Sequence, residues 1–75
     1  MERLYIWTIY RKGSKEFPFD FVAFQRDVTP EGEPGITGVM LGPELEPLRA
    51  ELRRQGYIVM PRFPEDSENI IETWL

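Results

Sequence analysis

The stretch VMLGPELEPLRAELRRQGYIVMP, residues 39–61, predicts a strand, an amphipathic helix and a second strand in that order. No other segment of the chain fits a helix. A helix that starts at Glu44 places Pro47 in the first turn, where the backbone N–H groups have no partner within the helix. We therefore expect a helix over residues 44–55, with Gly56 as its left-handed terminator.

The predicted helix has a narrow apolar stripe formed by Leu45, Leu48 and Leu52, so one side should pack and the rest should face water. Residues 39–41 lie between two glycines and predict a short buried strand. Residues 57–60 predict another strand, which Pro61 closes. If both strands share a sheet, general rules favour a parallel right-handed crossover through the helix.

The chain before this stretch is rich in aromatic and β-branched residues. Residues 3–11 alternate along a strand with two largely apolar faces, which is typical of a strand covered on both sides. Gly13 predicts a turn, and residues 20–28 predict a second strand that pairs with the first as an antiparallel hairpin. Residues 29–35 contain two prolines and two glutamates and predict an exposed loop.

The end of the chain predicts an acidic loop over residues 63–69 and a last apolar segment over residues 70–75. That segment could be a strand or a helical turn, and its Ile, Thr and Trp favour a strand. The predicted fold class is α+β, a small and mainly antiparallel sheet of about four to five strands with one helix packed on one face. Residues 1–75 form a single domain.

Composition restricts the chemistry that is open to this chain. It has 75 residues, no cysteine, no histidine and a formal net charge of −4. Disulfides, thiolate metal sites, thiol nucleophiles and the commonest general base are therefore absent. We expect a chain that is not an enzyme and uses no cofactor or metal. No signal peptide or membrane span is visible, so we expect a cytoplasmic protein that does not contact membrane.

Two weak patterns have simpler explanations. The acidic residues Glu65, Asp66 and Glu68 lack the spacing and glycine of a calcium loop, so they predict a solvated loop. The glycines between residues 32 and 42 lack the Gly-Lys-Ser/Thr ending of a phosphate loop and predict turns.

One helix can cover only one face of a sheet, so apolar residues on the other face would need a second chain to cover them. This favours a small non-enzymatic interaction or accessory protein that pairs with a second copy of itself, as a homodimer, or with a protein partner. Six aromatic and basic residues are the candidates for partner binding: Tyr5, Trp7, Arg11, Arg26, Arg62 and Trp74.

The alternative is a module that binds single-stranded nucleic acid through a rim of basic and aromatic side chains. Its basic residues would be Arg11, Lys12, Lys15, Arg26 and Arg62, beside Tyr5, Trp7 or Phe63. The net negative charge and the interspersed Glu16, Asp20 and Asp27 oppose this interpretation.

Short blocks along most of the chain resemble a family of small uncharacterised bacterial and phage-associated proteins. The blocks are WTIY (7–10), FP (17–18), FVA (21–23), MPR (60–62) with Pro64 and Asp66, and IETWL (71–75). The resemblance implies no activity, cofactor or catalytic residue. Phe24, Gln25 and Arg26 stand where the family would have a more basic stretch, which weakens the argument for a basic binding surface.

Overall fold

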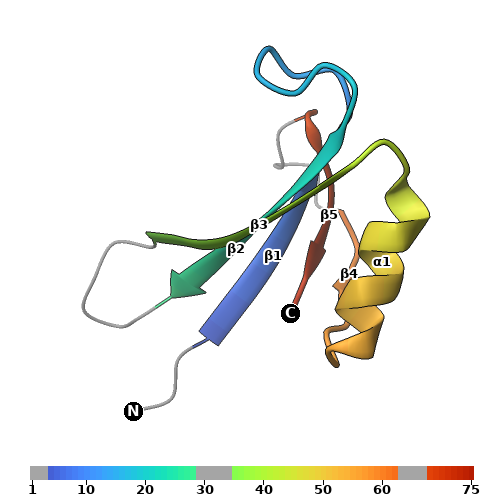
Figure 1. The fold of residues 1–75 in the computed structure, drawn as a ribbon. Helices are drawn as coiled ribbons and strands as arrows, with labels where there is room; N and C mark the ends of the chain where they lie inside the picture. The colour runs from blue at the N-terminus through green and yellow to red at the C-terminus, as the bar shows by residue number, and fades with distance from the viewer. Residues whose placement is uncertain (1–3, 29–34, 63–67) are drawn as a thin grey trace.

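The computed structural model describes residues 4–28, 35–62 and 68–75. Figure 1 shows a twisted sheet with a single helix beside it. In chain order the elements are β1 (Leu4–Tyr10), β2 (Phe21–Val28), β3 (Gly35–Gly42), α1 (Leu45–Arg54), β4 (Val59–Met60) and β5 (Ile70–Trp74).

The five strands form one sheet in the order β3-β2-β1-β5-β4, and every neighbouring pair is antiparallel. The α+β fold class is thereby confirmed, as are the hairpin of β1 with β2 and the closing strand β5. Successive antiparallel pairings make β3 and β4 run in the same direction, as expected for strands joined through α1. They do not pair, however, because three strands lie between them.

The helix lies where the prolines predict it. Glu44 is the N-cap with extended backbone angles, and Pro47 falls in the first turn. Gln55 is the C-cap, and Gly56 follows with a φ of 93°. Gly13 also adopts a positive φ, of 101°, in the β1–β2 connection. At both glycines the backbone enters a region that side chains disfavour. At Gly56 this conformation ends the helix.

Charged side chains along α1 pair with one another. Arg54 and then Gln55 donate hydrogen bonds to Glu51, and these lower the pKa of Glu51 from 4.5 to about 2. A carboxylate whose pKa is lowered by folding adds stability above its ordinary pKa, and that stability disappears as the pH falls towards 2.

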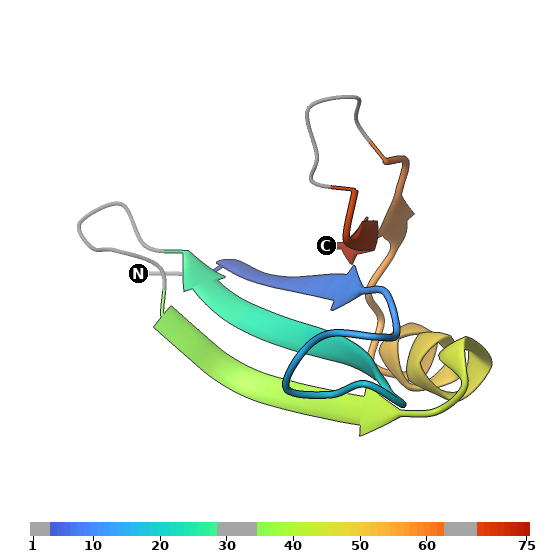
Figure 2. The same cartoon turned by 90° about the horizontal axis from the view of Figure 1, so that it is seen from above.

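The core lies between the sheet and α1. Leu48 and Leu52 of the helix pack against side chains from the three central strands. These strand residues are Trp7, Ile9, Ala23 and Trp74. The view in Figure 2 places α1 on one side of the sheet, so the prediction of a helix on one face holds.

The structure corrects the predictions for the two strands that flank the helix. Residues 39–41 belong to an eight-residue strand, β3, and Val39 and Leu41 are 50% and 45% exposed rather than buried. They are exposed because β3 is an edge strand and their side chains lie on the face without the helix. β4 is only two residues long, shorter than the predicted segment 57–60. Of the loops predicted over 29–35 and 63–69, residues 29–34 and 63–67 lie outside the described residues. Gly35 instead begins β3, and residues 68–69 form a turn before β5.

A hydrogen-bonded group of three side chains ties α1 to β5. Arg49 Nε and Nη2 donate to the two carboxylate oxygens of Glu72 at 2.8 and 3.2 Å, and Trp74 Nε1 donates to Glu72 Oε1 at 3.1 Å. The hydrogen bonds from Arg49 to Glu72 and then to Glu46 raise the pKa of Arg49, which therefore stays charged. Glu72 satisfies the buried indole and the half-buried guanidinium together.

Glu72→Ala should lower the free energy of unfolding by about 2 kcal/mol, because it leaves the Trp74 indole N–H and the Arg49 guanidinium without their shared acceptor. Glu46→Ala is the matched control. It removes the exposed partner of Arg49 and should cost less than about 0.5 kcal/mol. Urea titrations of both variants measure the difference, and equal losses would contradict this account of Glu72.

A close approach between β3 and β1 explains Gly38. A Cβ atom at this position would lie 3.2 Å from Trp7 Cη2 and 3.2 Å from Gln25 Oε1. The Gln25 side chain can move, but the Trp7 ring is enclosed in the core. Gly38 thus leaves the space that the indole occupies.

Gly38→Ala should destabilise the fold by roughly 1–2 kcal/mol because the added methyl group overpacks the Trp7 ring. Gly35→Ala provides the control, since nothing lies within 4 Å of a Cβ there and the backbone is not left-handed. Thermal unfolding of the two variants should separate them, and an unchanged midpoint for Gly38→Ala would contradict the close contact.

Candidate interaction face

The face of the sheet opposite α1, called the open face below, has no helix over it. Strand alternation assigns residues to it, because neighbouring side chains in a strand point to opposite sides. Trp7 and Ile9 face the helix, so Ile6, Thr8 and Tyr10 lie on the open face. Their partners and the matching residues of the other strands also lie on this face: Val22, Phe24, Arg26, Ile36, Val39, Leu41, Met60, Ile70 and Thr73.

A β-bulge gathers the apolar residues of β3 on the open face. Gln25 pairs with Gly38 and Arg26 pairs with Ile36, which leaves Thr37 as the extra residue. Without this bulge, Ile36 would lie on the same side as Gly38, facing the helix. The extra residue instead places Ile36 on the same face as Val39 and Leu41.

Ile36, Val39 and Leu41, called the β3 row, form an exposed apolar stripe. Their exposed fractions are 58%, 50% and 45%. The whole strand, GITGVMLG, contains no charged residue and is flanked by Pro34 and Pro43 in the sequence. An uncharged, apolar strand at a sheet edge is the type of surface that other protein strands bind.

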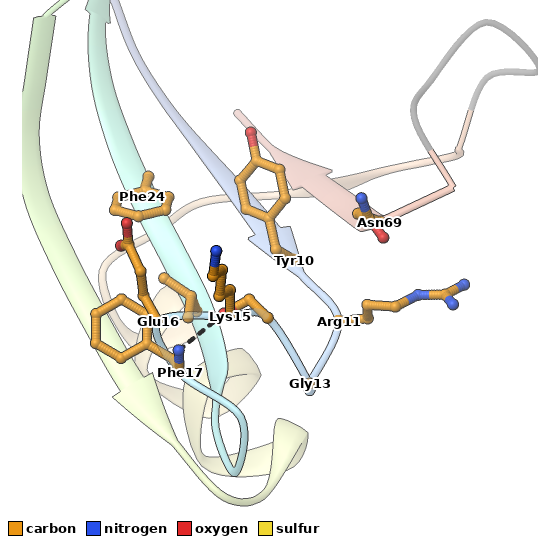
Figure 3. A pocket seen from close by; sticks show the side chains of 10 residues that line it. Tyr10, Arg11, Gly13, Lys15, Glu16, Phe17, Phe24 and Asn69 are labelled. Atoms are coloured by element: carbon orange, nitrogen blue, oxygen red, sulfur yellow. Dashed lines mark hydrogen bonds between the residues drawn. The ribbon is translucent and has the colours of Figure 1, made fainter.

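The open face also carries a cavity of about 480 Å³ beside the β1–β2 connection. Its floor includes Tyr10, Val22 and Phe24, and Lys15, Glu16 and Phe17 of the connection form its wall. Figure 3 shows the side chains of Lys15 and Glu16 reaching over the sheet, while Arg11 points away. The volume falls within the range of ligand pockets, roughly 300–1,000 Å³.

Hydrogen bonds and ring contacts fix the positions of the residues that line this cavity. Tyr10 and Phe24 meet edge to face with ring centroids 5.8 Å apart, and Arg26 Nη2 donates to the Tyr10 hydroxyl at 3.2 Å. The Phe17 N–H donates to Ser14 Oγ at 3.0 Å within the connection, as the dashed line in Figure 3 marks. The cavity is therefore continuous with the open face and has a defined lining.

Two of the residues predicted to bind a partner are in the core instead. Trp7 and Trp74 are 5% and 1% exposed and lie on the helix side of the sheet. Both indoles belong to the core cluster with Leu48 and Leu52 of α1, and the Trp7 ring also lies close to Gly38. Neither indole is available to a partner, so the inclusion of Trp7 and Trp74 in the predicted binding set was wrong.

The other four predicted residues do not form one cluster. Arg26 lies on the open face beside the cavity, whereas Tyr5 is exposed on the opposite face of β1. Arg11 lines the cavity but its side chain turns away from the sheet. Arg62 donates from Nε to the Ile70 carbonyl at 3.1 Å, near the other edge.

Sequence reasoning missed the β3 row and the Tyr10–Phe24 pair. The signal for the β3 row was present, because an eight-residue segment without charge between two prolines is uncommon on a surface. Because Gly38 has the character of a turn residue, the sequence pattern predicts only a three-residue buried strand, residues 39–41. Only the bulge reveals that Ile36 belongs with Val39 and Leu41.

Residues 4–28, 35–62 and 68–75 contain no group of three carboxylates placed to hold a metal ion. Among the same residues, no helix is long and apolar enough to cross a membrane.

Comparisons with protein-family models, with curated proteins and with solved structures give no match. The functional inference therefore depends on the geometry of the open face.

Proposed function

We propose that this chain is a small non-enzymatic interaction protein that binds an extended strand of a protein at the edge and open face of β3. The observation that carries the proposal is the β3 row, Ile36, Val39 and Leu41, exposed on an uncharged edge strand. An edge strand offers unpaired backbone N–H and C=O groups, and side chains on one face then select the partner.

Burial of the β3 row would favour binding. Each of these side chains leaves about half of its surface in water, and covering it should contribute roughly 1 kcal/mol. The neighbouring cavity would accept a side chain of the partner, because a side chain that extends past Val39 towards Phe24 would enter it. A partner strand with apolar residues at alternate positions fits this arrangement.

Selection from a random peptide library tests the proposal. Immobilised protein at low density should enrich peptides with alternating apolar residues, since only extended strands match both the edge and the β3 row. Val39→Lys should reduce the affinity of the enriched peptides at least about tenfold, because it places a charge in the contact.

Phe19→Lys is the matched control for that selection. Phe19 is 78% exposed and lies in the β1–β2 connection, so it tests the same change of an exposed apolar residue away from β3. The peptides enriched on the unmodified protein should bind the Phe19→Lys variant with unchanged affinity. Enrichment of no peptide, or of peptides that bind the Val39→Lys variant equally well, would refute the proposal.

The alternative, a module for single-stranded nucleic acid, has one supporting observation. The Tyr10 and Phe24 rings lie on the open face beside Arg26, with Lys15 reaching over the same cavity. Base stacking on such rings is worth about 1–3 kcal/mol per base. The Trp7 ring of the proposed rim is buried, and Phe63 lies outside the described residues.

Fluorescence anisotropy with labelled single-stranded oligonucleotides should show no binding at low salt, since the chain carries a net charge of −4. Binding that weakens steeply as salt is added, and that Arg26→Ala abolishes, would instead favour the nucleic-acid module.

A further inference from the structure

We infer that β3 pairs with β3 of a second copy of this chain, antiparallel and about a two-fold axis, so that two five-stranded sheets join edge to edge. This inference rests on the proposed function and names its partner. It starts from a contrast between the two edges of the sheet.

The two edges differ in how well they resist pairing with another strand. β4 has only two residues and is followed by Pro61, which are features that protect an edge. β3 has eight residues with no charge and no proline within it. Figure 2 shows β3 along one side of the sheet, with no other described element beside its outer edge.

A second copy fits this edge because the strand complements itself. Antiparallel pairing about a two-fold axis brings identical surfaces together, which is the commonest arrangement of protein dimers. Each chain has a net charge of −4, but β3 contributes none of it. The charges of the two copies are therefore kept away from the shared ladder.

The side chains of β3 indicate one register. With Met40 opposite Met40 of the second copy, Val39 lies opposite Leu41 on the open face, and Gly38 lies opposite Gly42. Cross-strand pairs of this type contribute roughly 0.2–1 kcal/mol each. The bulge at Thr37 ends the regular ladder, so pairing covers residues 38–42 and the two open faces merge into one.

The short ladder predicts a weak dimer. Stable interfaces bury about 1,200–2,000 Å² in total, and five paired residues on each side fall below that range. A dissociation constant on the order of 10 µM is expected for such an interface. The monomer and the dimer should therefore both be populated at ordinary laboratory concentrations.

Sedimentation equilibrium between about 1 and 500 µM tests the inference, a range that spans the expected dissociation constant. The weight-average mass should rise from 8.9 kDa towards twice that value. Val39→Lys should raise the dissociation constant at least about tenfold, because it places a charge opposite the apolar Leu41 of the other copy and puts the two lysines diagonally across the axis. Phe19→Lys should leave it unchanged. Leu41→Lys gives a second variant at the same contact if Val39→Lys fails to fold.

Amide hydrogen exchange distinguishes edge pairing from stacking of the open faces. Edge pairing adds backbone hydrogen bonds to the alternate N–H groups that point away from β2. These amides within residues 38–42 should therefore exchange more slowly as the protein concentration rises, while those of β4 should not change. A dimer without this protection, or one that tolerates both lysine variants, would overturn the inference.

A mass that stays at 8.9 kDa at every concentration would also overturn the inference. The proposed function would survive that result if the selected peptides still required Val39. If the peptides were also indifferent to Val39→Lys, the inference and the proposed function would fall together.

Discussion

A single ten-residue helix must cover a five-stranded sheet, and this constraint determines how the rest of the chain is arranged. Leu48 and Leu52 supply the contact, so the largest side chains gather under them. Trp7 and Trp74 occupy that side, and the Glu72 carboxylate joins the helix to β5 there. Ile6, Val22 and Phe24 of the central strands lie on the other face, which α1 does not cover.

The features that sequence predicted are local ones. Pro47 restricts its own backbone and Gly56 permits a positive φ, so the start and end of α1 follow from the chemistry of single residues. The hairpin of β1 and β2 follows from two strands adjacent in the sequence, joined by residues 11–20, which contain Gly13. In each case the decisive interaction lies within a few residues along the chain, where sequence patterns are most informative.

The features that sequence did not predict depend on distant contacts. Trp7 is enclosed by Leu48 and Leu52 of α1 and by the space above Gly38, so its burial becomes visible only when β3 is placed in the sheet. The candidate site was missed for a related reason. Residues 39–41 are apolar on both faces, and no local pattern tells which side the helix covers or that a bulge turns Ile36 outwards.

The two faces of β3 therefore have different surroundings, and different constraints act on their residues. Towards the helix β3 carries Gly38, whose lack of a side chain admits the Trp7 ring, and the partly buried Met40. On the open face, Ile36, Val39 and Leu41 lie outside the core that stabilises the monomer. Threonine or lysine at these three positions would keep the strand and protect its edge. Their apolar character is thus not explained by the core of one chain, and the proposed contact with another strand would give it a physical reason.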